Sequence, residues 1–486
     1  MIACTLCLVA LILGYIFYGR FVERVFGPDD RVTPAVAKAD GLDYIVLPSW
    51  KIFMIQFLNI AGTGPIFGAI MGAKFGPAAY LWIVFGCIFA GAVHDYMSGM
   101  LSMRHDGAGL PEMIGHYLGK TTKNVMLVLT VLLLIIVGAV FVYSPAEILH
   151  SIGGDTLMWI IVIFCYYFIA TMLPIDKIIG KIYPLFAIAL LFATGSLMVW
   201  LYLHWPTLPE LWSHCYNMGA ATEPDKWTDN IFPALFITIA CGAISGAHAT
   251  QSPLMARCMK SEKIGRPVFY GAMITEGIVA LIWATVSAWF FYGSPSPGYE
   301  LIQNATAGFH TSAPVVVNLV CNDWLGVAGT ILAMLGVVAA SITTGDTSLR
   351  SARLIIAEWL KLDQHPIPKR LIICIPLFTC SLALLIWQIG NPDSFNTIWQ
   401  YFGWCNQTLS VFTLWTITVY LVRQKKAFWI TLIPALFMTT VCTTYIFISK
   451  QMLHLSESVG YPLGIVCLVV ASLWFAVWYR KEKSQR

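Results

Sequence analysis

Charged residues are scarce in this chain of 486 residues. Lysine, arginine, aspartate and glutamate make up only 11% of it, whereas 58% of its residues are hydrophobic. Because soluble domains devote roughly a quarter of their residues to charged side chains, this composition excludes an ordinary soluble domain. It predicts an all-α protein that crosses a lipid bilayer many times, and it points to no nucleic-acid partner.

Constellations for metal binding or nucleophilic catalysis are also missing. The 13 cysteines are scattered along the chain, mostly inside apolar segments, as expected for small buried side chains. Cys215 and Cys321, predicted in loops on the same face, offer a disulfide as the alternative. We therefore expect no enzyme, no bound cofactor and no resident metal ion, apart from Na⁺ or H⁺ as a coupling ion.

Long hydrophobic runs divide the chain into thirteen predicted membrane helices, at about 20 apolar residues per span. Their ranges are 2–19, 50–73, 78–103, 124–148, 157–174, 180–204, 229–250, 267–291, 325–347, 370–390, 396–422, 427–449 and 460–480.

The basic residues give this division an orientation, because cytoplasmic loops carry an excess of lysine and arginine. All of the 29 lysines and arginines except Lys74, Lys226 and Lys450 fall on the loops, helix mouths or tail of one face. We therefore expect the N-terminus outside and the C-terminus in the cytoplasm. The two longest outer loops are predicted at about 205–228 and 292–324.

Two of the predicted helices are interrupted. Gly62-Thr63-Gly64-Pro65 divides the second helix, and the polar, glycine-containing stretch from Ala240 to Pro253 divides the seventh. Glycine and proline weaken or break a helix. Irregular backbone at membrane depth survives only inside protein or beside a wet cavity. Glycines that merely allow close helix packing are the alternative.

Each interrupted helix opens a group of five predicted helices, and the two groups have opposite orientations because five is odd. Matched discontinuous helices in an inverted repeat mark the binding site of many secondary transporters. The sequence therefore predicts one repeat at 50–204 and a second at 229–422. A peripheral helix and cytoplasmic loop occupy 1–49, and peripheral helices with a cytoplasmic tail occupy 427–486.

The two interruptions are predicted to form a substrate site near the middle of the membrane. No lysine or arginine is expected at that level, so an anionic substrate would be met by the N-termini of half-helices, near Pro65 and Ser252-Pro253. A carboxylate with a compensating cation suits such a site, and a zwitterion is the alternative. The predicted substrate-binding residues are Ala61, Gly62, Thr63, Gly64, Gly242, Ser245, Gly246, His248 and Gln251.

Few ionisable residues lie at membrane depth, where they are costly and usually functional. Glu276, in the middle of the eighth predicted helix, is a candidate carrier of a coupling proton, or else a protonated packing contact. Asp95 is a candidate for coupling as well, or for a gating ion pair with Arg104 or Arg257.

A Na⁺ site is the alternative to proton coupling. Ser341, Thr344 and Ser348 share one helical face, and their hydroxyl groups could complete an oxygen cage with main-chain carbonyls from Ala61 to Gly64. Serine and threonine hydroxyls also commonly bond the carbonyl one turn earlier in their own helix, which would leave no cage.

Several blocks of the sequence resemble the carbon starvation protein A family of peptide and pyruvate transporters, and they are spread over nearly the whole chain. The blocks are Thr33-Pro34-Ala35, Asp40-Gly41-Leu42-Asp43-Tyr44, Ile60 to Pro65, Ala90 to Asp95, Met103 to Gly107, Leu235 to Gly246, Tyr270 to Glu276 and Trp399 to Gln407.

The resemblance implies a bacterial inner-membrane nutrient transporter with a leucine-transporter-like core, and proton coupling for the pyruvate carriers. Departures in length and in particular residues bear on the substrate. The chain is shorter than the long members of the family, and it carries His94 where the family pattern usually has glutamine. The stretch from Ala247 to Pro253 also differs from the long members.

We therefore expect a secondary active transporter that imports a small carboxylate such as pyruvate by alternating access, in the response to carbon starvation. Small peptides are the alternative substrate. A channel would need a continuous polar lining, and a membrane sensor would need a soluble signalling domain; the sequence predicts neither. The substrate and the lipid bilayer are the expected partners.

Overall fold

The computed structural model describes residues 1–41, 43–172, 175–219, 230–293, 312–363, 366–391 and 394–485. Every regular element within these residues is a helix, and no strand occurs among them. Nine helices in this described part are long and apolar enough to cross a membrane. The protein is therefore an all-α, multi-pass membrane protein, as its composition predicts.

The elements follow one another with few long connections. In chain order they are α1 (Ile2–Leu13), η1 (Gly14–Tyr18), α2 (Gly19–Phe26), α3 (Pro34–Ala37), α4 (Ser49–Ala61), α5 (Gly64–Met71), η2 (Gly72–Phe75), α6 (Ala78–Leu81), η3 (Trp82–Gly91), α7 (Ala92–Arg104), α8 (Leu110–Leu118), α9 (Lys120–Ile152), α10 (Thr156–Met172), α11 (Ile175–His204), α12 (Leu211–His214), α14 (Ile231–Thr238), α15 (Gly246–Ala256), η4 (Glu262–Ile264), η5 (Arg266–Tyr270), α16 (Gly271–Tyr292), α18 (Ala313–Leu360), α19 (Ile367–Ile389), α20 (Ser394–Arg423), α21 (Trp429–Ile448) and α22 (Glu457–Ser484).

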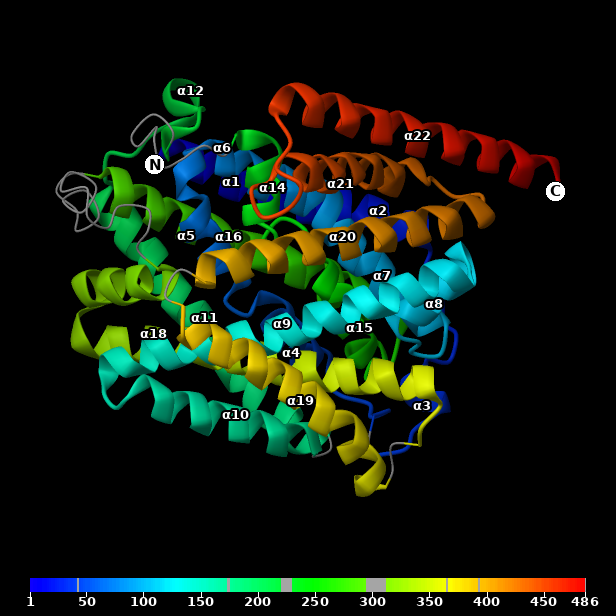
Figure 1. Ribbon diagram of the computed structural model, residues 1–486, viewed down its shortest axis with the longest axis horizontal. Coiled ribbons are helices and arrows are strands. Elements are labelled where there is room, and N and C mark those ends of the chain that lie inside the picture. The colour runs from blue at the N-terminus through cyan, green and yellow to red at the C-terminus, as the bar shows by residue number, and fades with distance from the viewer. Residues whose placement is uncertain are drawn as a thin grey trace.

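The helices gather in two groups, and α4 and α15 lie near the centre of the molecule (Figure 1). On one side α9, α10, α18 and α19 pack around a common cluster of buried aliphatic and aromatic side chains; we call these four helices the scaffold. On the other side α20 packs on α21 and α21 on α22, and α22 runs along the outer edge of the molecule. Helix α18 of the scaffold contacts α4 and α15 near the centre of the protein.

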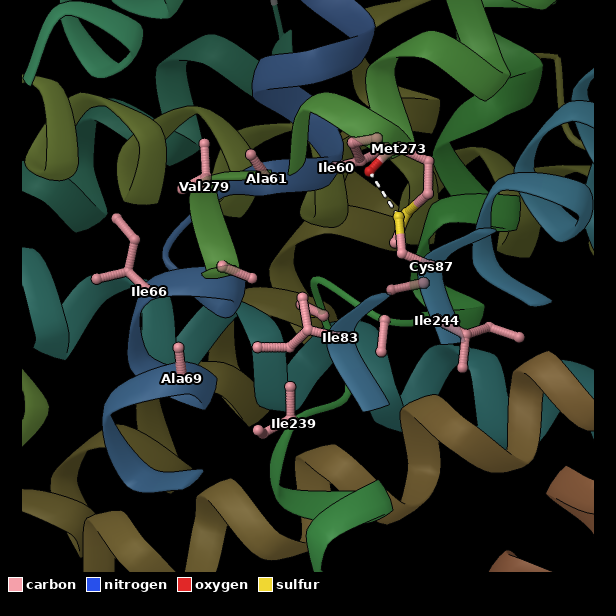
Figure 2. Packing of buried hydrophobic residues seen from close by; sticks show 14 of the residues in the cluster. Ile60, Ala61, Ile66, Ala69, Ile83, Cys87, Ile239, Ile244, Met273 and Val279 are labelled. Atoms are coloured by element: carbon pink, nitrogen blue, oxygen red, sulfur yellow. Dashed lines mark hydrogen bonds between the residues drawn. The ribbon is translucent and has the colours of Figure 1, made fainter. Parts of the chain in front are cut away.

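The centre is closely packed around both interruptions (Figure 2). Ile60 and Ile66 flank the first, and Ile239 and Ile244 belong to the second, and all four side chains are buried in one cluster. The thiol of Cys87 joins this cluster to α16 by donating a hydrogen bond to a main-chain carbonyl, at 3.3 Å. Such packing fixes the irregular backbone in one conformation.

Several helices extend beyond their predicted limits. Hydropathy places one span at 325–347, whereas α18 runs from Ala313 to Leu360. Its extensions contain polar residues such as Asn318 and Arg350, which lower the hydropathy but remain compatible with a helix. The backbone leaves the helical region at Gly326, with φ 61° and ψ −177°, so the long helix is kinked there.

The outer loops are only partly described. Residues 220–229 and 294–311, which include Lys226, lie outside the described residues. Cys215 is an exposed free thiol whereas Cys321 is buried. The alternative of a disulfide between them is therefore wrong.

Candidate functional site

The first interrupted helix consists of α4 and α5. They are separated by Gly62, with φ 47° and ψ −141°, and by Thr63. A residue with a Cβ rarely adopts this conformation, and a Cβ on Gly62 would lie 2.6 Å from Oγ1 of Thr344. α5 starts at Gly64 with Pro65 in its first turn, where a missing N–H costs nothing. The half-helix therefore starts where the sequence predicts it.

The second interrupted helix consists of α14 and α15, which are separated by the segment from Ile239 to Ser245. Gly242 has φ 89° in this segment, and a Cβ there would lie 2.5 Å from Cβ of Ala280. α15 starts at Gly246, so the predicted half-helix start near Ser252-Pro253 is wrong. A proline inside a helix removes one main-chain hydrogen bond, and α15 continues through it.

Helix α20 holds both halves of the second interrupted helix. Oδ1 of Asn406 accepts hydrogen bonds from the hydroxyl of Ser245 (3.0 Å) and from the N–H of Ala247 (2.7 Å). It thereby satisfies a free N–H in the first turn of α15. Nε2 of Gln407 donates to the carbonyl of Phe236 in α14, at 2.9 Å. The predicted site omits both amides, although two adjacent amides in an apolar helix were a usable signal.

Buried ionisable side chains from α7, α15 and α16 form a continuous line beside this interruption. Nδ1 of His94 and Nδ1 of His248 each lie 2.8 Å from a different oxygen of Asp95. Nε2 of His248 lies 3.6 Å from Oε2 of Glu276. The other oxygen of Glu276 accepts the N–H of Gly242 at 3.0 Å. The structure therefore brings together Asp95, His248 and Glu276, which the sequence singles out separately.

Two facing atoms in this line have no hydrogen-bond partner. An ionised carboxylate only accepts hydrogen bonds, so both Nδ1 atoms beside Asp95 carry hydrogen, and Nε2 of a neutral His248 is then an acceptor. It faces a second acceptor, Oε2 of Glu276, and neither atom has a hydrogen-bond partner although both side chains are buried. Unpaired buried polar atoms are rare. One proton bound between them would pair both.

The predicted ion pair of Asp95 with Arg104 or Arg257 is wrong. Arg104 lies nine residues further along the same helix, roughly 13 Å away, and its guanidinium lies 2.9 Å from Glu262. Arg257, at the end of α15, lies 3.6 Å from Glu358 of α18. Asp95 instead contacts two histidines inside the protein.

Polar side chains join α15 to the scaffold. Nε2 of Gln251 donates to the hydroxyl of Ser348 (3.2 Å), and the hydroxyl of Thr347 donates to Oε1 of Gln251 (3.4 Å). The ion pair between Arg257 and Glu358 adds a second link between the same helices. Gln251 therefore lies at the boundary between an interrupted helix and the scaffold.

The residues predicted for a Na⁺ cage lie beside the first interruption. Oγ1 of Thr344 is 3.4 Å from the carbonyls of Leu58 and Asn59, in the last turn of α4. The hydroxyl of Ser341 donates to the carbonyl four residues earlier, at 3.2 Å, which is the alternative noted for such hydroxyls.

Unpaired polar groups also surround the first interruption. The amide of Asn59 and the hydroxyl of Thr63 are buried and make no hydrogen bond. Oε1 of Gln56 is likewise unpaired, while its Nε2 lies 3.5 Å from Ser252 of α15. Leaving such groups unpaired costs free energy. They indicate a place where a polar ligand or water is held beside the interrupted helices.

One group of described residues has donor atoms for a metal ion, because Cys241, His248 and Glu276 place them within 4.8 Å of one another. The sulfur of Cys241 is already engaged: it donates to Ser245 and accepts from Asn406, both at 3.7 Å. The other two donors, Nε2 of His248 and Oε2 of Glu276, have no hydrogen-bond partner, and a proton held between them would supply one.

Sequence comparisons find similarity along nearly the whole chain. The family model described as carbon starvation protein CstA matches residues 1–153, 142–320 and 299–445. A membrane protein of Haemophilus influenzae is 44% identical over 345 residues, covering 61% of this chain and 93% of the relative. The peptide transporter CstA of Escherichia coli is 26% identical, covering 89% of this chain and 78% of the relative. The pyruvate/proton symporter BtsT of Escherichia coli is 25% identical, covering 89% and 79%.

A solved transporter structure shares the fold. A mutant of the manganese transporter of Eremococcus coleocola superposes with a TM-score of 0.55 at 15% sequence identity, covering 92% of this chain and 99% of that chain. Similarity at this level of identity concerns the fold alone. The transported substrate has to be inferred from the residues of this chain and from its closer relatives.

Proposed function

The chain belongs to the carbon starvation protein CstA family, and we propose that it is a proton-coupled transporter that imports a small carboxylate, pyruvate or a similar 2-oxo acid. Relatives described as a peptide transporter and as a pyruvate/proton symporter support transport as its role. The family name supports a role under carbon starvation. The bias of basic residues supports an inner-membrane protein with the N-terminus outside.

The proposed architecture is thirteen membrane helices with two inverted repeats of five, at 50–204 and 229–422. Interruptions at Gly62–Thr63 and at Ile239–Ser245, one in each repeat, support it. The fold shared with a known transporter supports a leucine-transporter-like core. In this architecture α4 and α15 move against the scaffold to expose the site to either side in turn.

The observation that carries proton coupling is that two buried atoms, Nε2 of His248 and Oε2 of Glu276, face each other at 3.6 Å and neither has a hydrogen-bond partner. A proton delivered from one side of the membrane satisfies both atoms, and Asp95 holds the imidazole in the required orientation through Nδ1. Binding the proton also adds one positive charge to the site. That charge compensates an anionic substrate in a low-dielectric interior.

A carboxylate substrate fits the neutral groups at the first interruption. The amide of Asn59 and the hydroxyl of Thr63 are unpaired donors, and the N-terminus of α5 adds free N–H groups and a positive dipole end. Such a site can bind an anion without a lysine or arginine side chain. The charge balance then depends on the proton held at His248 and Glu276, which couples the two binding events.

Uptake into proteoliposomes tests the proposal. Labelled pyruvate and a labelled dipeptide are offered under an inward H⁺ gradient, an inward Na⁺ gradient, or neither. We expect the H⁺ gradient to drive accumulation of pyruvate. Accumulation of the dipeptide alone would assign the chain to peptide transport, and accumulation that follows only the Na⁺ gradient would overturn proton coupling.

Glu276→Gln tests the assigned proton site. The amide keeps an oxygen acceptor for the N–H of Gly242 but cannot take up the proton. We expect gradient-driven accumulation to fall at least about fiftyfold, while exchange of pyruvate across the membrane continues. Glu147→Gln is the matched control, since that carboxylate lies in α9 and bonds Ser312. Normal accumulation by Glu276→Gln would remove the carboxyl from coupling.

A further inference from the structure

Two hollows lie along α20 and α22, away from the interrupted helices. The first has a volume of about 380 Å³ and a largely apolar lining, which includes Leu118, Phe412, Trp415, Trp474 and Trp478. The second has a volume of about 400 Å³ and lies at the ends of the same two helices. Along both helices, the residues that line the apolar hollow come before those that line the second, polar hollow.

The second hollow is cationic. Lys425, Lys426 and Lys483 line it, and its one acidic residue, Glu482, lies 3.7 Å from the guanidinium of Arg423. Lys426 donates to a main-chain carbonyl, and burial, with Arg104 nearby, lowers the pKa of its ammonium group. The ammonium groups of Lys425 and Lys483 make no hydrogen bond or ion pair among the described residues. Two ammonium groups therefore remain for an anion.

The spacing of the hollows matches the depth profile of a membrane leaflet. Trp474 and Lys483 are nine residues apart on α22, which corresponds to roughly 13 Å along the helix axis. The hydrocarbon part of one leaflet is about 15 Å deep. The lysines belong to the face that carries most basic residues of the chain. When they lie at headgroup level, the apolar hollow lies at the depth of the acyl chains.

We propose that this cleft binds an anionic phospholipid. Lys425 and Lys483 bind the headgroup phosphate, and one acyl chain lies in the apolar hollow beside Trp474. Basic pockets between membrane helices on the cytoplasmic side bind anionic headgroups by the same chemistry. The inference does not depend on which substrate the protein transports.

Native mass spectrometry of the detergent-purified protein tests the headgroup contact. Phosphatidylglycerol is titrated against phosphatidylcholine with the same acyl chains, and we expect the anionic lipid to bind preferentially. The double variant Lys425→Gln/Lys483→Gln should weaken phosphatidylglycerol binding about twenty-five-fold, at roughly a factor of five for each lysine. The control Lys361→Gln/Lys369→Gln removes the same charge elsewhere on that face, and its binding should stay within twofold.

Trp474→Ala tests the acyl-chain contact. It should weaken binding of dioleoyl phosphatidylglycerol severalfold and leave the dihexanoyl lipid unaffected. Equal losses in the lysine control would show non-specific attraction and overturn the proposal. So would displacement of the lipid by millimolar inorganic phosphate, which would define a phosphate site, or a dimer mass in place of the lipid adduct. Only variants that elute from size-exclusion chromatography at the same volume as the unmodified protein are compared, so that misfolded variants are left out.

Discussion

The two interrupted helices differ in the length of their breaks and in what surrounds them. The first break consists of Gly62 and Thr63 alone, and the neutral groups of Asn59 and Thr344 lie beside it. The second extends from Ile239 to Ser245, with amides of α20 and ionisable groups of α7 and α16 around it. Two features that look alike in the sequence therefore offer different chemistry.

The difference follows from main-chain hydrogen bonding. A longer break frees more N–H and carbonyl groups, and each needs a partner inside a membrane protein. Asn406 and Gln407 supply such partners from a neighbouring helix, and Glu276 supplies one for the N–H of Gly242. The carboxylate that we assign to proton coupling is thus also a support of the broken backbone. On that assignment, protonating it would change how the second break is held, whereas the contacts described at the first break involve neutral groups.

The largest effect is expected from Gly242→Ala. The added Cβ would meet Cβ of Ala280 at 2.5 Å, and φ of 89° is strained for alanine. Overpacking and strain together cost about 3 kcal/mol, and the N–H that bonds Glu276 is displaced. We expect uptake in proteoliposomes to fall at least about a hundredfold. Gly390→Ala is the control, because its nearest neighbours are 3.7 Å away. Unchanged uptake by Gly242→Ala would show that the second break tolerates rearrangement.

The sequence predicts the position of both breaks because glycine and proline act locally. It misplaces the start of α15 near Ser252-Pro253, since Pro253 is accommodated within that helix. For Asp95 it leaves an arginine partner open as an alternative to coupling, whereas the structure places the adjacent His94 and the distant His248, 153 positions away, beside it. Contacts between residues more than 150 positions apart depend on how the helices pack, and no local pattern in the chain specifies them.

Substitutions of Asn406 test whether its acceptor oxygen holds the second break in place. Asn406→Ala leaves the hydroxyl of Ser245 and the N–H of Ala247 without their acceptor, at a cost of about 2 kcal/mol. We expect uptake to fall about thirtyfold. Asn406→Asp keeps an acceptor oxygen at the same place and should retain uptake within about threefold. The unfolding temperature of each variant is measured alongside uptake. If Asn406 only fills space, the aspartate variant should match wild type in unfolding temperature as well as in uptake. Equal losses in both variants would contradict the acceptor role.

The smallest effect is expected at the first break. Ser341→Ala removes a hydroxyl that bonds its own helix, and Thr344→Ala removes one that lies 3.4 Å from two carbonyls. Each hydrogen bond contributes only about 1 kcal/mol net, so each single variant should lose at most about fivefold of its H⁺-driven uptake. With the proposed proton coupling, a Na⁺ gradient should drive no uptake before or after the change. Na⁺-driven uptake that the double variant loses would reverse the comparison: the first break would then hold the coupling cation, and the line from Asp95 to Glu276 would serve only to stabilise the second.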